Sequence, residues 1–401
     1  MIEIIDKMKC SGCAACMNAC PKKCIDMKED KEGFLYPLVD INLCINCGIC
    51  KKKCPILNIK KERQFEQDGY IVQIKDEIIR RESTSGGAFT AIAKYVISKK
   101  GVVFGAAYNE KLEVYHTYVE KEEHLKKFRN SKYVQSIIGS SYKKAKKFLD
   151  KGRMVCFSGT PCQIEGLSCY LGKEYNNLIT VDVVCHGVPS PLVWRKYLEI
   201  QREKYKETFN NIIFRDKYYG YKYSTMTIKN SLDEDIYNMG VESDPMLRAF
   251  FSEICERPIC HGCLFKKRYR VGDFTIWDCF SVENFNKKMD DDKGTTKLLI
   301  HTTKGKRVFE NIKNDVRYLK IDADILTEGV NEMIESVKPN PLRLQFMNDL
   351  NSITSKELFN KYFPDNIRVK LERNLRIATN KLGIYKFSKN TYISIKNRLF
   401  R

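Results

Sequence analysis

The sequence predicts a mixed α+β / α/β protein built from three parts. Nine of its 17 cysteines fall within the first 54 residues, which indicates a small cysteine-rich N-terminal domain. From Gly69 onward, short apolar runs alternate with helical patterns, as is typical of an α/β architecture. After Asn340 the chain becomes helical and basic. We therefore expect domains over residues 1–60 and 61–335 and a helical basic C-terminal tail over residues 336–401.

Composition places the chain among globular proteins. Hydrophobic residues make up 43% and charged residues 30%, with 22 Gly and 11 Pro in 401 residues, which excludes disordered and collagen-like classes. The net charge of +20 favours an anionic partner, although no nucleic-acid-binding motif accompanies it. We find no secretory signal and no apolar run long enough to span a membrane. We expect a cytoplasmic protein, peripheral at most to the inner face of the membrane, that does not bind nucleic acid.

The N-terminal cysteines form two copies of one run, C-x2-C-x2-C-x3-C-P, which is the ligand pattern of bacterial-type dicluster ferredoxins. In that pattern three thiolates of each run hold one 4Fe-4S cluster, and the fourth ligates the cluster of the other run. Zinc is the alternative, but paired CxxC knuckles do not explain a duplicated array of eight cysteines. Cys24 lies outside the pattern and is expected to be a buried thiol. The expected ligands are Cys10, Cys13, Cys16 and Cys54 for cluster one and Cys44, Cys47, Cys50 and Cys20 for cluster two.

The larger domain begins with a strand, a loop and a helix. The patterns predict a strand over residues 70–74, a helix over 88–99 and a further strand over 102–108. Between the first strand and the helix lies the phrase Ser83-Thr84-Ser85-Gly86-Gly87. Hydroxyls and glycines at the start of a helix leave backbone N–H groups free to meet an anion such as a nucleotide phosphate. An ordinary helix N-cap is the alternative interpretation.

Four further cysteines stand where a doubly wound sheet places its ligands. Cys162 and Cys185 each follow an apolar strand pattern, so they can converge in the crevice at the carboxyl ends of the strands. Cys260 and Cys263 form a CxxC pair ahead of strand-like residues 273–277. These four thiols are candidates for a third 4Fe-4S cluster, and a zinc site or buried free thiols are the alternatives.

Several phrases follow the N-terminal array in order: Ser85-Gly86-Gly87, Ser131-Lys132-Tyr133-Val134-Gln135-Ser136, Gly159-Thr160-Pro161-Cys162-Gln163, Cys185-His186-Gly187, Cys260-x2-Cys263 and Asn340-Pro341-x-Arg343-x2-Phe346. Together they resemble the family of coenzyme F-420 hydrogenase/dehydrogenase beta subunits over about residues 1 to 350. The resemblance implies an α/β flavin-binding domain that holds FAD, with an iron–sulfur cluster beside it. It also favours Cys162, Cys185, Cys260 and Cys263 as ligands of that cluster. The cofactor contacts that it implies are Ser85, Gly86, Gly87, Ser131, Lys132, Tyr133, Gly159 and Thr160.

The sequence departs from the family pattern after the CxxC pair. It has Ile276-Trp277-Asp278-Cys279-Phe280-Ser281 where the family commonly has a glycine-containing phrase. Bulky side chains in place of glycines are expected to reshape the substrate side of the flavin. The phrase from Cys185 to Pro191 looks more like bacterial members that resemble companions of surface-polysaccharide enzymes. A small or glycan-related substrate and a role in polysaccharide biosynthesis are therefore expected, with coenzyme F-420 as the other acceptor.

The tail predicts a cationic amphipathic helix. From position 366 to 401 the sequence has ten Lys or Arg residues and one acidic residue, Glu372. Such a helix can lie on an anionic membrane or dock its apolar face on the protein's own core, and we expect the docked arrangement. The apolar residues at helical spacing are Ile367, Leu371, Leu375, Ala378, Leu382 and Tyr385.

These features predict an iron–sulfur, flavin-dependent oxidoreductase. Electrons would pass between the ferredoxin-type clusters and FAD, with hydride transfer to or from an organic substrate. The expected partner is an external electron donor or acceptor, either ferredoxin-like or a deazaflavin. The alternatives are a coenzyme F-420-dependent oxidoreductase subunit, a pure electron-transfer subunit, and a basic binding module whose clusters serve stability or sensing. His186 and Asp278 are the candidates for proton delivery, and each has an ordinary structural role as its alternative.

Overall fold

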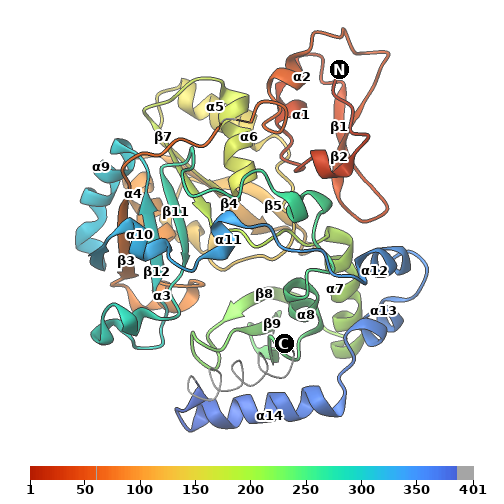
Figure 1. Ribbon diagram of the computed structural model, residues 1–401, viewed down its shortest axis with the longest axis vertical. Helices are drawn as coiled ribbons and strands as arrows, with labels where there is room; N and C mark the ends of the chain where they lie inside the picture. The colour runs from red at the N-terminus through yellow and green to blue at the C-terminus, as the bar shows by residue number, and fades with distance from the viewer. Residues whose placement is uncertain (60, 386–401) are drawn as a thin grey trace.

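The computed structural model describes residues 1–59 and 61–385, which form three lobes (Figure 1). The N-terminal domain lies at one end, and a large mixed sheet with helices on both faces lies in the middle. A smaller sheet and the C-terminal helices form the opposite end. Across the described part of the chain, no helix is both long and apolar enough to cross a membrane.

The N-terminal domain is built around the two cysteine runs. Each run enters a short helix through a residue in the left-handed region, Ala14 (φ 57°) in the first run and Gly48 (φ 72°) in the second. This backbone turns the chain sharply between consecutive cysteines. An antiparallel hairpin, with Ile25 opposite Val39, completes the domain. The elements are the 3-10 helix η1 (Lys7–Lys9), α1 (Ala15–Ala19), β1 (Ile25–Glu29), β2 (Leu35–Val39) and α2 (Ile49–Lys52).

The large sheet has the strand order β13-β3-β12-β11-β7-β6-β4-β5. Strands β4, β6, β7 and β11 are parallel, and β12 is antiparallel to both β11 and β3. Strand β3 therefore runs in the same direction as the parallel set, and their carboxyl ends share one edge of the sheet. The strands are β3 (Asp68–Ile74), β4 (Val102–Tyr108), β5 (Val114–Val119), β6 (Val155–Gly159), β7 (Leu178–Val183), β11 (Phe274–Asp278), β12 (Thr296–Ile300) and β13 (Val316–Ile321).

Helices cover both faces of this sheet. Val103 packs with Ile92 and Phe309 on one face, whereas its neighbour Phe104 packs with Tyr142 and Ile164 on the other. Burial of both faces explains why these strands are nearly continuous apolar runs. The α-helices are α3 (Glu77–Glu82), α4 (Ala88–Ser98), α5 (Ser141–Asp150), α6 (Pro161–Leu171), α9 (Thr303–Ile312), α10 (Ala323–Thr327) and α11 (Asn331–Ile334), and the 3-10 helices are η2 (Glu122–Phe128), η3 (Pro258–Gly262), η4 (Val282–Asn284), η5 (Lys287–Met289) and η6 (Lys313–Asp315).

The smaller sheet is antiparallel, with the order β10-β9-β8, and has its own core. Trp194 and Phe214 lie in this core together with Phe346 and Phe359 from the C-terminal region. The segment over residues 343–363 is therefore part of a buried core, and the exposed basic segment begins after it. The elements are α7 (Pro191–Tyr205), β8 (Phe209–Asp216), β9 (Thr225–Asn230), β10 (Asp235–Gly240), α8 (Pro245–Phe251), α12 (Arg343–Asp349), α13 (Ser355–Tyr362) and α14 (Ile367–Lys381).

The elements predicted for the start of the large domain are confirmed. The predicted strands over 70–74 and 102–108 correspond to β3 and β4, and the predicted helix over 88–99 is α4, which ends at Ser98. Apolar periodicity was sufficient here because these elements are amphipathic or fully buried, so packing and local pattern agree.

The expected docking of the C-terminal apolar face is wrong. Helix α14 forms as predicted, but Ile367 and Leu371 are exposed, at 77% and 64% of their surface. The helix contacts the protein through its opposite side, where Val369 and Thr379 are buried. Tyr385, assigned to the apolar face, is buried as well. Residues 386–401, which carry the rest of the predicted basic tail, lie outside the described residues.

Arg257 holds the N-terminal domain against the large domain and is fully buried. Its Nε donates to the carbonyl of Cys10 (2.8 Å) and its Nη2 to the carbonyl of Leu35 (3.0 Å). Its Nη1 donates to Oε1 of Gln135 (2.9 Å) in the large domain. The guanidinium carbon lies 4.1 Å from the centre of the Tyr36 ring. A fully buried cation at the boundary between the domains thus has polar partners on both sides.

We expect Arg257→Met to lower the free energy of unfolding by about 3 kcal/mol, because it leaves the buried carbonyls of Cys10 and Leu35 without donors. Arg195→Met is the matched control. Arg195 pairs with Glu29 across the same boundary, but both side chains are more than one-third exposed, so its loss should stay below about 1 kcal/mol. Urea unfolding followed by circular dichroism measures both. Equal losses in the two variants would contradict the role of Arg257.

Candidate metal centres

The four cysteines predicted for cluster one lie together in the structure. Cys13 and Cys16 are buried, and burial is the main reason why the pKa of each thiol is raised. The thiols of Cys10 and Cys54 are close enough to raise both pKa values further. Cys54 belongs to the second run, so the crosswise arrangement of the ferredoxin pattern brings these four side chains together. Their role as ligands stays a prediction.

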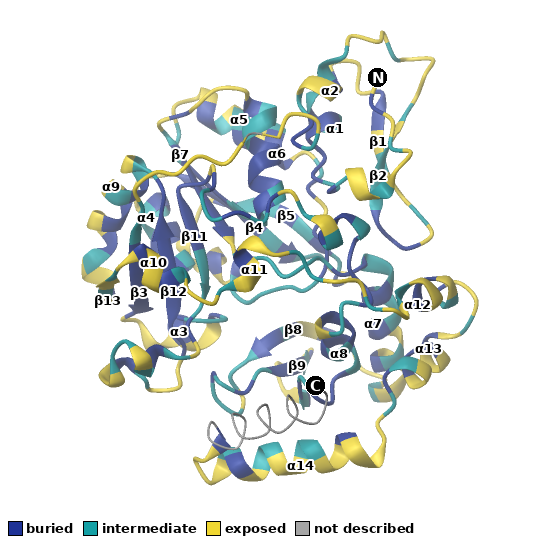
Figure 2. Ribbon diagram, viewed as in Figure 1, coloured by how far each residue is buried: buried dark blue, intermediate teal, exposed yellow. Residues whose placement is uncertain are grey.

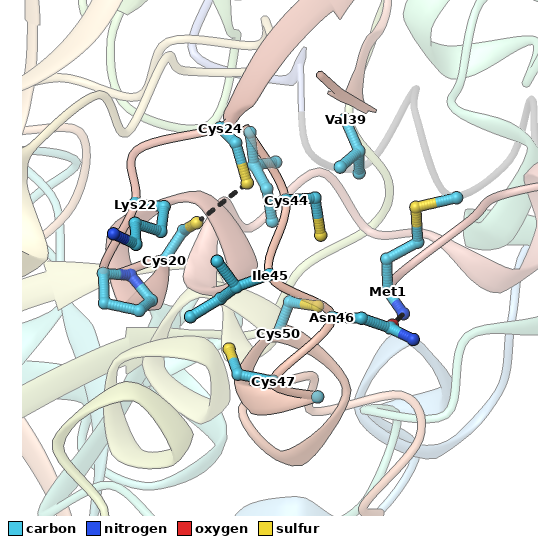
Figure 3. A pocket seen from close by; sticks show the side chains of 13 residues that line it. Met1, Cys20, Lys22, Cys24, Val39, Cys44, Ile45, Asn46, Cys47 and Cys50 are labelled. Atoms are coloured by element: carbon cyan, nitrogen blue, oxygen red, sulfur yellow. Dashed lines mark hydrogen bonds between the residues drawn. The ribbon is translucent and has the colours of Figure 1, made fainter. Parts of the chain in front are cut away.

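The cysteines predicted for cluster two surround a cavity with about 340 Å³ of empty space (Figure 3). Cys24, expected to be a buried thiol, is indeed buried, but it also lines this cavity. Its sulfur lies 3.4 Å from the sulfur of Cys20. A fifth thiol therefore stands beside the predicted ligand set, which the spacing pattern alone did not reveal. The cysteines around the cavity are Cys20, Cys24, Cys44, Cys47 and Cys50.

The third set of cysteines also converges. Cys162, Cys185, Cys260 and Cys263 line a cavity with about 480 Å³ of empty space. Cys162 lies in the first turn of α6 and Cys185 follows β7, so both stand at the carboxyl edge of the parallel strands. Cys260 and Cys263 are brought there by η3. The pKa values of the Cys162 and Cys185 thiols are raised to about 12, mainly by burial and in smaller part by the neighbouring thiols.

Three cationic side chains that the sequence patterns did not single out line the same cavity. Lys266 donates from Nζ to the carbonyl of Cys185 (2.5 Å), and Arg270 donates to Asp182 (2.7 Å) and to the carbonyl of Val183 (2.9 Å). The third is Arg257. Lys266 and Arg270 come from the basic run after the CxxC pair, and that run was the available signal. Positive charge beside thiolates favours the reduced state of a cluster, because it offsets the added electron.

The donor sets fit 4Fe-4S clusters. Each has four thiols around a shared space, which is the ligand chemistry that a cubane requires. Burial raises the pKa of Cys13, Cys16, Cys162 and Cys185, so binding of a cluster by these thiols would release protons. Within residues 1–59 and 61–385, no three His, Cys, Asp or Glu side chains are grouped closely enough to hold a single metal ion.

The first and third cysteine sets are neighbours. Cys162 is close enough to raise the pKa of Cys13, although burial of Cys13 is the larger cause. Gly166 of α6 permits this approach, because a Cβ there would lie 3.1 Å from the sulfur of Cys13 and 2.9 Å from the hydroxyl of Tyr142. Helix α6 thus directs Cys162 into the cavity of the third cysteine set. Its Gly166, which has no side chain, faces Cys13 of the N-terminal domain.

Two predicted flavin-binding segments meet at the sheet edge. The hydroxyl of Thr84 accepts from the backbone N–H of Ser131 (2.7 Å) and lies 3.1 Å from the Ser131 hydroxyl. The backbone at Gly86 packs closely against β3, since a Cβ at this position would lie 2.2 Å from the carbonyl oxygen of Val72. Gly87 caps α4 with φ of 82° and without a side-chain acceptor for the first N–H groups of the helix. The start of α4 thus has the free amides that an anion needs.

Lys132 and Tyr133 extend this segment inward. Burial lowers the pKa of Lys132 to about 7, and its Nζ donates to the carbonyls of Arg129 and Asn130. The Tyr133 ring stacks on Phe250 with centroids 4.3 Å apart. Lys132 and the Tyr133 ring are suitable for a cofactor contact. In this structure, however, the ammonium group of Lys132 already has the carbonyls of Arg129 and Asn130 as hydrogen-bond acceptors.

Gly159 and Thr160 border the third cysteine set. The Thr160 hydroxyl lies 3.1 Å from the sulfur of Cys162. Thr160 and Gln163 form a reciprocal capping box at the start of α6, so the protein itself satisfies these N-terminal groups. This favours a structural role for Thr160 over the predicted cofactor contact.

His186 and Asp278 are both held by other side chains. His186 lines the third cavity, its ring packs edge-on against Phe250, and burial lowers its pKa. Asp278 ends β11 and accepts from Arg215 (3.2 Å) and from the hydroxyl of Tyr221 (3.0 Å). Both hydrogen bonds tie Asp278 to neighbouring side chains, so it is better placed to fix Arg215 than to deliver a proton.

Family comparison addresses the resemblance directly. Residues 152–324, which include Cys162, Cys185, Cys260 and Cys263, match the C-terminal part of the beta subunit of coenzyme F420 hydrogenase/dehydrogenase. The chain carries a domain of this family. Residues 9–58 match the 4Fe-4S dicluster domain. The predicted resemblance is thereby confirmed over residues 152–324, and the N-terminal 4Fe-4S dicluster domain over residues 9–58.

Individual relatives carry F420 in their names. The coenzyme F420-dependent sulfite reductase of Methanocaldococcus jannaschii is 25% identical over 359 residues, which cover 85% of this chain and 50% of that protein. One component of the F420H2 dehydrogenase of Methanosarcina mazei is 24% identical over 172 residues, 40% of this chain and 48% of that protein. The chain thus spans about half the length of these curated relatives. A solved structure of the F420-reducing NiFe hydrogenase complex from Methanosarcina barkeri aligns at 16% identity with a TM-score of 0.43, over 74% of this chain and 89% of that chain.

We expect Cys47→Ala to lower the iron content by about four atoms per chain and Cys24→Ala to leave it unchanged, because one cubane needs four thiolates and the duplicated pattern already supplies them. Iron and acid-labile sulfide are measured on protein purified without oxygen. Cys24→Ala matches Cys47→Ala in chemistry and lines the same cavity. An iron loss in Cys24→Ala as large as that in Cys47→Ala would make Cys24 a ligand and overturn the assignment.

Proposed function

We propose that the chain is an iron–sulfur flavoprotein oxidoreductase. The N-terminal cysteines would hold two 4Fe-4S clusters, the third set another, and the sheet edge at α4 would hold FAD. When bound, the clusters supply single-electron transfer, and the flavin couples single electrons to hydride transfer. The residues of the chain bind and orient these groups and exclude water from the space between them.

The contact between the N-terminal domain and α6 is the observation that carries this proposal. Cys13, a predicted cluster-one ligand, lies against the helix whose first turn contains Cys162. A separate electron-storage domain would have no need for such an approach, whereas a relay requires short distances between neighbouring centres. Arg257 supports the relay further, because it bonds to the carbonyl of Cys10 and also lines the third cavity.

A side-chain path supports FAD at the sheet edge near α4. The ring of His186, next to Cys185 of the third set, packs against Phe250 with centroids 5.0 Å apart. Phe250 in turn stacks on Tyr133, which belongs to the segment that meets the Ser83–Gly87 loop through Ser131. A flavin contacted by this loop and by Tyr133 would stand at the far end of packed side chains that begin at the third cavity.

The relatives favour a deazaflavin as the hydride partner. Both relatives described above are named for F420. We therefore propose coenzyme F420 or a similar deazaflavin as the first acceptor to test. The small or glycan-related substrate, the role in polysaccharide biosynthesis and the external ferredoxin-like donor stay predictions from the sequence.

The deciding measurement is the content of iron, sulfide and flavin in protein purified without oxygen. We expect about twelve irons and one FAD per chain, because three cubanes and one two-electron carrier are proposed. About eight irons without flavin would reject this function and leave a pure electron-transfer protein.

Cys162→Ser tests the relay. We expect about eight irons per chain to remain and reduction of the flavin by a ferredoxin-type donor to slow at least tenfold, because the centre between donor and flavin is lost. Cys169→Ser, on the same helix but outside the third cavity, is the control and should retain about twelve irons. Flavin reduction is followed by stopped-flow absorbance. An unchanged rate in Cys162→Ser would contradict the relay.

A further inference from the structure

Helix α14 has exposed positions along its length (Figure 2), and several of them carry large apolar side chains. Ile367, Leu371, Leu375 and Leu382 are exposed at 77%, 64%, 61% and 72% of their surface. At about 100° of rotation per residue these four positions fall within an arc of roughly 80°. They form one stripe, which we call the outer stripe. Contiguous exposed apolar side chains of this size mark an interaction surface.

The side of α14 that faces the protein is the polar one. Arg376 pairs with Glu372 (2.6 Å) and lies 3.8 Å from Glu242, a buried carboxylate next to the small sheet. Asn380 donates to the carbonyl of Tyr219 (2.7 Å), and Arg373 lies 3.4 Å from Asp365. The contacts to Glu242 and Tyr219 hold the helix in an orientation opposite to that of an ordinary surface helix, whose apolar face is buried. The outer stripe therefore stays exposed while the helix is docked on the protein.

Cations border the outer stripe. Arg368 lies on one side of it and Lys370 and Lys381 on the other, at about 100°, 300° and 320° from Ile367 around the helix. Between positions 366 and 385 the sequence has one acidic residue, Glu372, and Arg376 binds it on the inner side. The solvent-facing side of α14 thus combines large aliphatic side chains with uncompensated positive charge. This combination is complementary to a bilayer that carries anionic headgroups.

We propose that α14 binds the surface of an anionic lipid bilayer, with the outer stripe inserted at the level of the headgroups. Arg368, Lys370 and Lys381 would lie beside the lipid phosphates. In Figure 1, α14 forms the edge of the molecule opposite the N-terminal domain, so a bound chain would keep its cysteine-rich domain away from the lipid. The helix lies in the plane of the surface and does not span it.

A second copy of the chain is the less suitable occupant. A two-fold contact between two outer stripes would bring the bordering cations of both copies together without carboxylates between them. Like charges in apposition weaken such a contact. An anionic surface removes this repulsion and adds attraction.

Flotation of the full-length, cluster-loaded protein with lipid vesicles tests the proposal. We expect binding to vesicles of phosphatidylglycerol and phosphatidylethanolamine, and at least tenfold weaker binding to phosphatidylcholine vesicles. Leu371→Glu/Leu375→Glu should lower binding to the anionic vesicles at least tenfold. Lys370→Ala/Lys381→Ala should lower it by roughly fivefold per cation at low salt and less at high salt, because headgroup attraction is screened.

Ile78→Glu/Ile325→Glu is the matched control, since these side chains are 73% and 56% exposed on α3 and α10 and the same two charges are added. It should bind like the wild type. Iron content and melting curves show whether each variant is folded. Absence of wild-type binding to anionic vesicles, or full binding by Leu371→Glu/Leu375→Glu, overturns the proposal. A wild-type dimer that Leu371→Glu/Leu375→Glu converts to monomer, with no vesicle binding, would assign the outer stripe to a second copy and equally overturn it.

Discussion

The buried guanidinium of Arg257 is the interaction on which the arrangement of the cysteine sets depends. It donates to backbone carbonyls of the N-terminal domain and to Gln135 of the large domain, and it stacks on Tyr36. Arginine suits this place because its planar group offers donors in several directions and keeps its charge when buried. Lysine would supply one compact charge and could not stack in the same way. The packing of Cys13 and Ala15 against Ile164 of α6 adds to the contact that Arg257 makes.

The carboxyl edge of the parallel strands is the second constraint. Strands β6 and β7 lead to Cys162 and Cys185, β3 leads to the Ser83–Gly87 loop, and β11 ends at Asp278. Parallel strands end together only if long crossovers return the chain each time, and α4 and α6 are such crossovers. Positions far apart in the sequence therefore share one edge, which is where open α/β sheets bind ligands. The CxxC pair reaches the same place through η3, which packs outside the sheet.

Charge balance links these two constraints. A ring of thiolates in a buried cavity is costly unless positive charge and donors accompany it. Arg257, Lys266 and Arg270 line the third cavity, and all three donate hydrogen bonds to backbone carbonyls. Some of the cations that contribute to the net charge of +20 therefore lie inside the protein, around the cysteines, and do not face a partner. The remainder includes the cations of α14, where positive charge borders exposed leucines instead of buried thiols.

The sequence by itself determined the elements whose information is local. The two cysteine runs predicted the dicluster domain, and apolar periodicity predicted β3, α4 and β4, because spacing and period depend on neighbouring residues alone. It also predicted the family through phrases whose order is itself sequence information. Tertiary structure decided the rest. The place of Cys24 beside Cys20, the clamp by Arg257 and the outward turn of α14 arise from partners that are distant in the chain, such as Leu35 for Arg257 and Glu242 for Arg376. A helical wheel identifies an apolar stripe but does not show which side of the helix packs on the protein. Here Arg376 lies near the buried carboxylate of Glu242, so the polar side faces the protein.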